Sequence, residues 1–262
     1  MMASRTLSHL TLIVCATAAA TSGCSREPTT PEARRQRGDE IVRAMSDRLA
    51  QATTFTVETT DTRERSRGGR KVTLQTTRRF TLRRPDRLAV QVTGDGDLNG
   101  WYDGQKLTFV SNAQKVWVRV NAEPNIDATL DRLAERLAMP MPVADFMYSS
   151  PYDALIGKAS TGGYVGRETL EGVATIHVAY QHPSVDWDLW VNEQGDPLPK
   201  KYRVTDKTLT PPRTVEVVFN KWQLGAAVAD AAFAPVVPDG YERIPLAVQA
   251  EEPAPAAAPA TP

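Results

Sequence analysis

Two carboxylates are placed where they could act as a pair. Asp186 and Asp188 are two residues apart in a segment that alternates polar and apolar side chains, so on a β-strand they project from one face, about 7 Å apart. With His177 or His182 nearby, such a pair could exchange protons with a substrate or bind a metal ion. The alternation also puts Trp187 on the opposite, apolar face, which favours the interpretation that both carboxylates are solvated. The sequence therefore allows two interpretations of this pair, a hydrolase site and a solvated polar surface.

Other chemical motifs are incomplete. The segment 95–106 begins like a calcium-binding loop, but Lys106 stands at its closing position, where a glutamate is needed. A glycine-rich hairpin explains the segment better. Gly157-Lys158 lacks the glycine spacing and the following Ser or Thr of a phosphate-binding loop, and no Gly-x-Ser-x-Gly elbow occurs. We therefore expect no cofactor and no metal, and a protein that is not an enzyme unless the aspartate pair is a site.

The amino-terminal segment has the layout of a bacterial lipoprotein signal. Arg5 precedes an apolar stretch over residues 10–14, small residues follow, and Thr21-Ser22-Gly23 leads to Cys24. This is the order of a secretory signal, with a cysteine at the position that is acylated in a lipobox. We predict a lipoprotein signal peptide over residues 1–23 and lipid attachment at Cys24.

The residues after Cys24 predict where the protein resides. Residues 24–37 are mostly polar and include two prolines, which is typical of a flexible tether. Ser25, in place of the Asp that retains lipoproteins at the inner membrane, favours the periplasmic face of the outer membrane. Ordinary cleavage near Ala18 or Ala20 is the alternative, and it would leave a protein soluble in the periplasm or secreted.

Composition excludes several classes of protein. The 31 basic and 31 acidic residues balance, which argues against a nucleic-acid partner. Cys15 leaves with the signal, so the mature fold has neither a disulfide nor a thiol nucleophile. Residues 38–246 are enough for one substantial core, and we expect a single domain that is a monomer. Residues 247–262 are rich in Ala and Pro and predict a disordered tail.

Hydrophobic periodicity predicts one helix followed by a long antiparallel sheet. Apolar residues recur at helical spacing over 38–52. After this the period changes to two, as in strands with one wet face. The alternating segments are 55–57, 72–74, 80–82, 88–92, 107–109, 116–120, 176–180, 187–191, 202–204 and 215–219. Turns are expected at Asp103-Gly104 and at residues 112–114.

A second helix interrupts the sheet. Over residues 126–137, Leu130 and Leu133 belong to an apolar stripe opposite charged residues, which predicts an amphipathic helix packed on the sheet. A sheet this long must close or be covered. We therefore expect a mainly β (α+β) fold: an unclosed, strongly curved antiparallel barrel with covering helices and a concave interior.

Aromatic side chains on several predicted strands could line that interior. Most of them are expected in the core, because aromatic residues dominate core burial. Trp117 and Trp190 alternate out of register with their apolar neighbours, so they face the other side of the sheet as a partner patch or as cavity lining. The candidate ligand-binding residues are Trp101, Tyr102, Phe109, Trp117, Leu130, Leu133, Trp187 and Trp190.

Four short motifs carry a resemblance to a known family. They are RPDRL (84–88), WYDGQKL (101–107), DWDLWV (186–191) and PLPKK (197–201). They closely resemble a family of predicted periplasmic proteins known only as a domain of unknown function. Through the hairpin at 103–107 and a Phe, Pro, Gly pattern over 233–240, that family is similar to the lipoprotein localisation factors LolA and LolB. The resemblance implies a LolA-like half-barrel with helices as a lid, whose cavity takes acyl chains.

These observations favour a lipid-anchored protein that binds a lipid or an acylated lipoprotein, with the membrane contacted through its own lipid. The helix around Leu130 and Leu133 would be a movable cover. The alternative is an envelope scaffold or sensor that binds a protein partner, for which Trp117 and Trp190 would form the contact. A hydrolase acting through Asp186 and Asp188 is the third hypothesis.

Overall fold

The computed structural model describes residues 27–67, 70–94, 97–137, 143–157, 159 and 161–245. The predicted signal peptide, Cys24 and the tail at 247–262 lie outside these residues. The helical elements are α1 (Pro31–Ala50), α2 (Ile126–Leu137), α3 (Pro151–Ile156) and the short 3-10 helices η1 (Ala144–Phe146) and η2 (Asp230–Phe233). The strands are β1 (Thr54–Arg67), β2 (Arg70–Arg83), β3 (Arg87–Gly94), β4 (Leu98–Tyr102), β5 (Lys106–Ser111), β6 (Val116–Asn121), β7 (Thr161–Leu170), β8 (Val173–Gln181), β9 (Val185–Asn192), β10 (Pro199–Asp206), β11 (Arg213–Leu224) and β12 (Glu242–Arg243).

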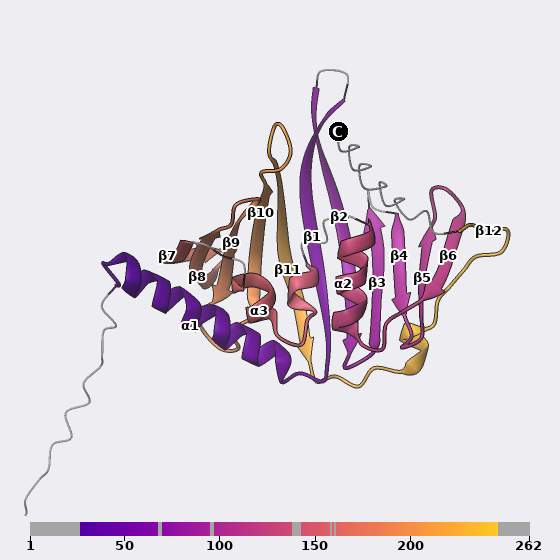
Figure 1. The fold of residues 1–262 in the computed structure, drawn as a ribbon, viewed down its shortest axis with the longest axis horizontal. Helices are drawn as coiled ribbons and strands as arrows, with labels where there is room; N and C mark the ends of the chain where they lie inside the picture. The colour runs from indigo at the N-terminus through magenta and orange to yellow at the C-terminus, as the bar shows by residue number, and fades with distance from the viewer. Residues whose placement is uncertain are drawn as a thin grey trace, which may run out of the picture.

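All twelve strands form one open sheet in the order β12-β6-β5-β4-β3-β2-β1-β11-β10-β9-β8-β7. Two meanders, β1 to β6 and β7 to β11, meet where β1 pairs with β11 in the middle of the sheet. The chain must therefore travel from one side of the sheet to the other between β6 and β7. It does so through α2, η1 and α3, which lie with α1 in front of the same face (Figure 1). We call this the concave face, and it confirms the expected unclosed, curved sheet covered by helices.

The predicted strands are confirmed, with two corrections. Segments 72–74 and 80–82 belong to the single long strand β2, which pairs with β1 along its whole length. The strands β7 and β12 were missed: β7 is rich in glycine, and β12 contains only two residues. Strand β4 was indicated only through the hairpin expected at Asp103-Gly104. The turn at Asp103-Gly104 is confirmed, with Gly104 at a φ of +88°, a conformation that glycine adopts without strain.

Helix α1 begins earlier than expected. The sequence predicted a helix over 38–52, but Pro31 already occupies the first turn, and the Thr30 hydroxyl caps the helix by accepting a hydrogen bond from the Ala33 amide at 3.2 Å. Residues 31–37, predicted as part of the tether, are therefore helical. Farther along, Gly38 lies against β7: a Cβ there would approach the Gly163 Cα to 2.6 Å. Helix and strand thus pack backbone against backbone.

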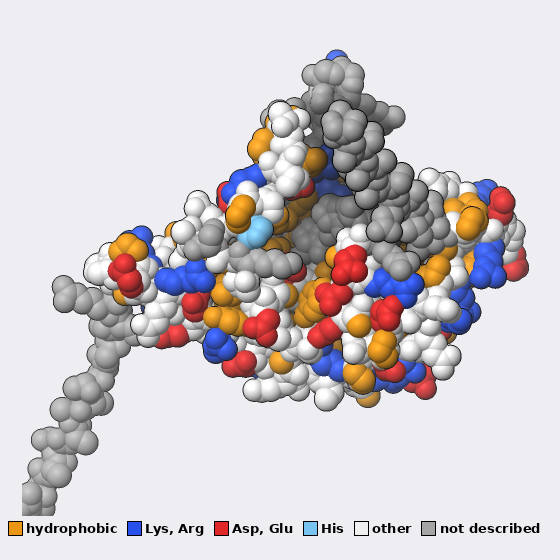
Figure 2. Space-filling model, viewed as in Figure 1, with side chains coloured by type: hydrophobic (Ala, Val, Ile, Leu, Met, Phe, Trp, Pro, Cys, Tyr) orange, Lys and Arg blue, Asp and Glu red, His pale blue; other side chains and the backbone are white. Residues whose placement is uncertain are grey.

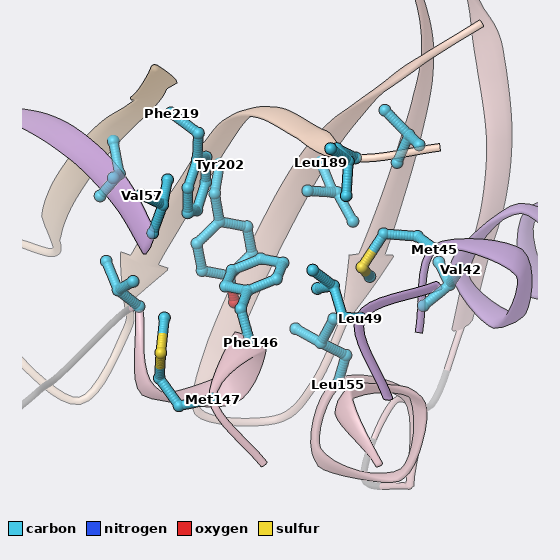
Figure 3. Packing of buried hydrophobic residues seen from close by; sticks show 14 of the residues in the cluster. Val42, Met45, Leu49, Val57, Phe146, Met147, Leu155, Leu189, Tyr202 and Phe219 are labelled. Atoms are coloured by element: carbon cyan, nitrogen blue, oxygen red, sulfur yellow. The ribbon is translucent and has the colours of Figure 1, made fainter. Parts of the chain in front are cut away.

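The main core lies between the helices and the concave face. Val42, Met45 and Leu49 of α1 are fully buried and face the sheet near Leu189 (Figure 3). From the sheet come residues such as Phe55, Val57, Leu82, Tyr102, Val178, Tyr180, Trp187, Tyr202, Val217 and Phe219. Burial of this apolar surface holds the helices on the sheet.

The opposite, convex face carries a smaller core that the sequence did not predict. Ala89, Trp101 and Val110 are buried there under Phe233 of η2, and Trp117 packs beside them. The segment after β11 brings Phe233 across this face and then adds β12 beside β6 as a parallel neighbour. Part of the convex face, which was expected to be exposed to solvent, is therefore buried.

Candidate functional site

Helix α2 and residues 143–156, which we call the lid, cover the middle of the concave face (Figure 1). The apolar stripe of α2 faces the core. Its residues Ile126, Leu130 and Leu133 have exposed fractions of 1%, 4% and 9%. The predicted helix over 126–137 is thus confirmed in its bounds and its buried stripe. After α2 the chain continues to Phe146 and Met147, which are 0% and 1% exposed. The lid therefore fills the interior of the half-barrel as well as covering it.

Phe146 is the side chain of the lid that reaches deepest among the aromatic residues of the sheet. Its ring meets the Tyr202 ring edge-on, with centroids 5.1 Å apart, and lies against Phe219 at 5.0 Å (Figure 3). Edge-to-face contacts of this kind add to the stabilisation from burial. Burial, together with the nearby Asp145 carboxylate, raises the pKa of the Tyr202 phenol well above its ordinary value. The Tyr202 phenol is therefore uncharged where it borders the interior.

Arg84 fastens the lid to the sheet. Its guanidinium donates hydrogen bonds to the carbonyl oxygens of Met147 and Tyr148, at 3.1 and 2.8 Å. Burial of the guanidinium lowers the pKa of Arg84, and the Asp127 carboxylate opposes that effect. Tyr148 in turn donates its hydroxyl to Asp131 of α2 at 2.9 Å. The lid is thus held over an apolar interior by polar contacts as well as by its buried side chains.

The structure divides the predicted ligand-binding residues between the two faces. Tyr102, Leu130, Leu133 and Trp187 belong to the core of the concave face, and Phe109 packs against it. The other three residues are on the convex face: Trp101, Trp117 and Trp190. The eight residues therefore do not face one interior, and the five on the concave side remain the candidates for contact with a ligand there.

Trp190 and Trp117 are also not an open patch. Trp190 is 3% exposed on the convex face, because Lys201 and Arg203 lie over its ring at 5.1 and 5.3 Å and His177 stacks on it at 4.2 Å. Arg243 of β12 covers Trp117 in the same way, at 5.2 Å. The alternation predicted the face of these two residues correctly, but not that neighbouring cations would cover them.

His177 is the centre of a polar network that sequence reasoning undervalued. Its ring nitrogens lie 2.9 Å from Glu168 Oε1 and 2.8 Å from Asp188 Oδ1, and the Trp190 indole donates to Glu168 Oε2 at 2.9 Å. His177 is only 8% exposed. The network ties β7, β8 and β9 together through side chains. A histidine that alternates with buried residues gave no signal of this, because its partners come from two other strands, β7 and β9.

The pair Asp186 and Asp188 does not form a joint site. Asp186 pairs with Lys207 at 2.6 Å, whereas Asp188 is directed to His177 and also lies 3.9 Å from Arg203. Each carboxylate is therefore engaged by its own cation or ring. In the part of the chain that the structure describes, no group of His, Cys, Asp and Glu side chains could hold a metal ion.

Within the described ranges, none of the helices combines the length and the apolar character that crossing a membrane requires. A family model described as "Predicted periplasmic protein (DUF2092)" matches residues 38–247. No curated protein matches the chain.

Several solved structures are similar in architecture at low sequence identity. A LolA superfamily protein from Nitrosomonas europaea is 13% identical, with 79% of this chain and 99% of that chain covered and a TM-score of 0.36. The lipoprotein LppX from Mycobacterium tuberculosis is 9% identical, with coverage of 73% and 96% and a TM-score of 0.38. MucB of the Pseudomonas aeruginosa MucA/MucB complex is 12% identical, with coverage of 76% and 61% and a TM-score of 0.36.

Proposed function

Since the chain belongs to the DUF2092 family of predicted periplasmic proteins, we propose that it is a non-enzymatic carrier of the bacterial envelope that binds a lipid or the acylated end of a lipoprotein in its half-barrel. In this proposal Cys24 is acylated and anchors the protein at the periplasmic face of the outer membrane. Acylation rests on the sequence pattern around Cys24, which lies outside the described residues.

The buried lid is the observation that supports the proposal most directly. The apolar interior is occupied by the side chains of Phe146 and Met147, which come from the short segment between α2 and α3. An acyl chain could take their place: each CH₂ group removed from water contributes about 0.8 kcal/mol. A chain of about ten CH₂ groups would therefore supply about 8 kcal/mol, enough to offset exposure of the two lid side chains.

The lid is also built to move as a unit. Its contacts with the sheet include the apolar face of α2, the Phe146 cluster, the hydrogen bond from Tyr202 to Asp145 and the two hydrogen bonds from Arg84. Strands β1, β2 and β11 below it are paired with one another through backbone ladders in which the lid takes no part. Opening would therefore cost side-chain contacts and leave the backbone pairing of the sheet unchanged.

Native mass spectrometry of the full chain tests the carrier function. The protein is purified from the bacterial envelope, detergent is removed, and its mass is compared before and after extraction with organic solvent. A mass difference that extraction abolishes is expected, and analysis of the extract gives the class of lipid. A protein without bound lipid that also takes up no fluorescent fatty acid or lipopeptide would contradict the proposal.

Metabolic labelling tests the anchor separately. Cells that express the chain are grown with a radioactive fatty acid, and the wild type is compared with Cys24→Ser. Label on the wild type alone is expected. Label on neither protein, with the mature chain in the soluble periplasmic fraction, would favour ordinary signal cleavage.

A further inference from the structure

The concave interior contains a buried polar cluster in the middle of the sheet. The alternation that directs Phe55 and Val57 of β1 into the core also directs Thr59 and Asp61 there. Their exposed fractions are 0% and 2%. The cross-strand partner of Thr59 is Phe219, against which the lid residue Phe146 packs. The cluster is therefore continuous with the apolar space proposed to hold an acyl chain.

Two arginines accompany Asp61. Arg78 Nη1 donates to Asp61 Oδ2, and Arg63 Nη2 donates to the same oxygen at 3.3 Å. The side chains of Arg78 and Arg63 are 22% and 36% exposed, so each reaches from the interior toward solvent. Counted together, the two guanidiniums and one carboxylate carry one net positive charge.

Hydrogen bonding within this cluster is incomplete. Among the described residues, Asp61 Oδ1, the Thr59 hydroxyl and Arg63 Nε have no hydrogen-bond partner, although all three atoms are buried. Each such atom costs about 1–3 kcal/mol relative to a satisfied one. Native proteins have few of them, and these three on one face of β1 leave a donor and two acceptors available to a polar group from elsewhere.

We infer that Thr59, Asp61, Arg63 and Arg78 form the head-group site for an amphiphile with an anionic head, a carboxylate or a phosphate. This inference rests on the proposed function and names the class of its ligand. The anionic oxygens accept hydrogen bonds from Arg63 Nε, which has no partner, and from the Arg78 guanidinium, because the arginine fork suits both anions. A hydroxyl of the head, where present, donates to Asp61 Oδ1. The acyl chain extends toward Phe219 and the lid. Figure 2 shows the face that carries the helices, which is hollowed beside the β1–β2 hairpin and has hydrophobic side chains along the hollow.

Binding of dodecanoate and dodecanol to the full chain tests the charge requirement. The two probes share one apolar chain and differ in the charge of the head. Wild-type protein should bind dodecanoate more tightly. In Arg78→Gln the affinity for dodecanoate should fall about tenfold, because one charge-assisted hydrogen bond is lost, and the affinity for dodecanol should hold within about twofold. The same pattern is expected for Arg63→Gln, whose side chain is 36% exposed.

Arg79→Gln is the matched control. Arg79 is the next residue of β2, so it faces the convex side, where it pairs with Glu58 at 3.4 Å and is 51% exposed. This variant removes the same charge from the same strand and should change neither affinity. Asp61→Asn makes the opposite change, because it removes the carboxylate that competes for the arginines, and it should strengthen dodecanoate binding. Damage to folding would weaken both probes together, and thermal unfolding of each variant detects it.

The outcomes separate the two proposals. If wild type binds neither probe, the carrier function fails and the head-group site fails with it. If both probes bind equally, or if Arg78→Gln and Arg79→Gln behave alike, the carrier function stands and the head-group site is wrong. Competition by inorganic phosphate alone at similar concentrations would also overturn the inference, because it would make the cluster a site for free anions.

Discussion

The ring of Phe146 stands edge-on to the ring of Phe219, with centroids 5.0 Å apart and planes inclined at 71°. Phe146 comes from the lid and Phe219 from β11, so this contact joins the lid to the sheet. Under the proposed carrier function, an incoming apolar ligand would have to separate these two rings.

Replacement of Phe146 by Ala should destabilise the protein and open its interior. The loss is expected to be about 3–5 kcal/mol, because a fully buried ring is removed and a cavity remains. Uptake of a fluorescent fatty acid should nevertheless become faster, since the side chain that fills the interior is absent. Urea unfolding and stopped-flow fluorescence measure the two effects.

Phe233→Ala is the control for that variant. Phe233 is 2% exposed in the convex-face core, away from the lid. It should cost a similar free energy of unfolding and leave the rate of uptake unchanged. If both variants accelerate uptake equally, general loosening of the protein explains the result and the lid has no special part in it.

Arg84→Gln should loosen the lid in particular. The variant loses the hydrogen bonds to the carbonyl oxygens of Met147 and Tyr148. Amide hydrogen exchange over residues 143–156 should become faster, while the core strands keep their protection. The adjacent Arg83 is a natural control, because it contacts the Val228 carbonyl and Asp230 on the convex side. Arg83→Gln should accelerate exchange near η2 instead, and the same exchange pattern in both variants would contradict a specific latch.

Alternation of side chains predicted most of the sheet, because the concave face is apolar along nearly every strand. The amphipathic helix α2 was predicted equally well, because its apolar stripe is formed entirely by residues of the helix itself. The start of α1 had a local signal that was overlooked: Thr30 followed by Pro31 and Glu32 is a typical helix N-terminus.

The candidate site was harder to predict, because its residues are defined by partners that are distant in the chain. Asp61 lies in a strand where Thr, Glu and Arg are frequent, so the sequence gives no reason to place it inside. It is buried because Val217 of β11 and Thr76 of β2 flank it. The covering of Trp101 and Trp117 likewise depends on the segment around Phe233, which has no regular period.

Asp188→Asn should cost more stability than Asp186→Asn. Asp188 faces the buried His177 at 2.8 Å, so its neutral substitute leaves a buried ring with a weaker partner, at a cost of about 1–2 kcal/mol. Asp186 forms a partly exposed pair with Lys207, and such pairs contribute less than about 1 kcal/mol. Urea unfolding of the two variants measures the difference. Equal losses would contradict the network around His177.

The turn at Asp103 should make stability depend on pH in the acid range. Burial opposes ionisation of Asp103, but the backbone amides of Lys106 and Gln105 and the Arg119 guanidinium outweigh it and hold the pKa of Asp103 below its ordinary value. A carboxylate with a lowered pKa stabilises the fold above the pKa of the unfolded chain, about 3.9, and loses that contribution as the pH falls through the folded value. Asp103→Asn should therefore lower the free energy of unfolding by up to about 1 kcal/mol near neutral pH, and the difference from wild type should vanish in strong acid.

Arg119→Gln gives an independent check on this carboxylate. It removes one of the three groups that stabilise ionised Asp103, so it should reduce the acid dependence without abolishing it. The measurement is urea unfolding of wild type and both variants across the acid range. Because Asn can still accept the amide hydrogen bonds of the turn, a difference between wild type and Asp103→Asn that stays constant with pH would contradict a contribution from the charge of Asp103.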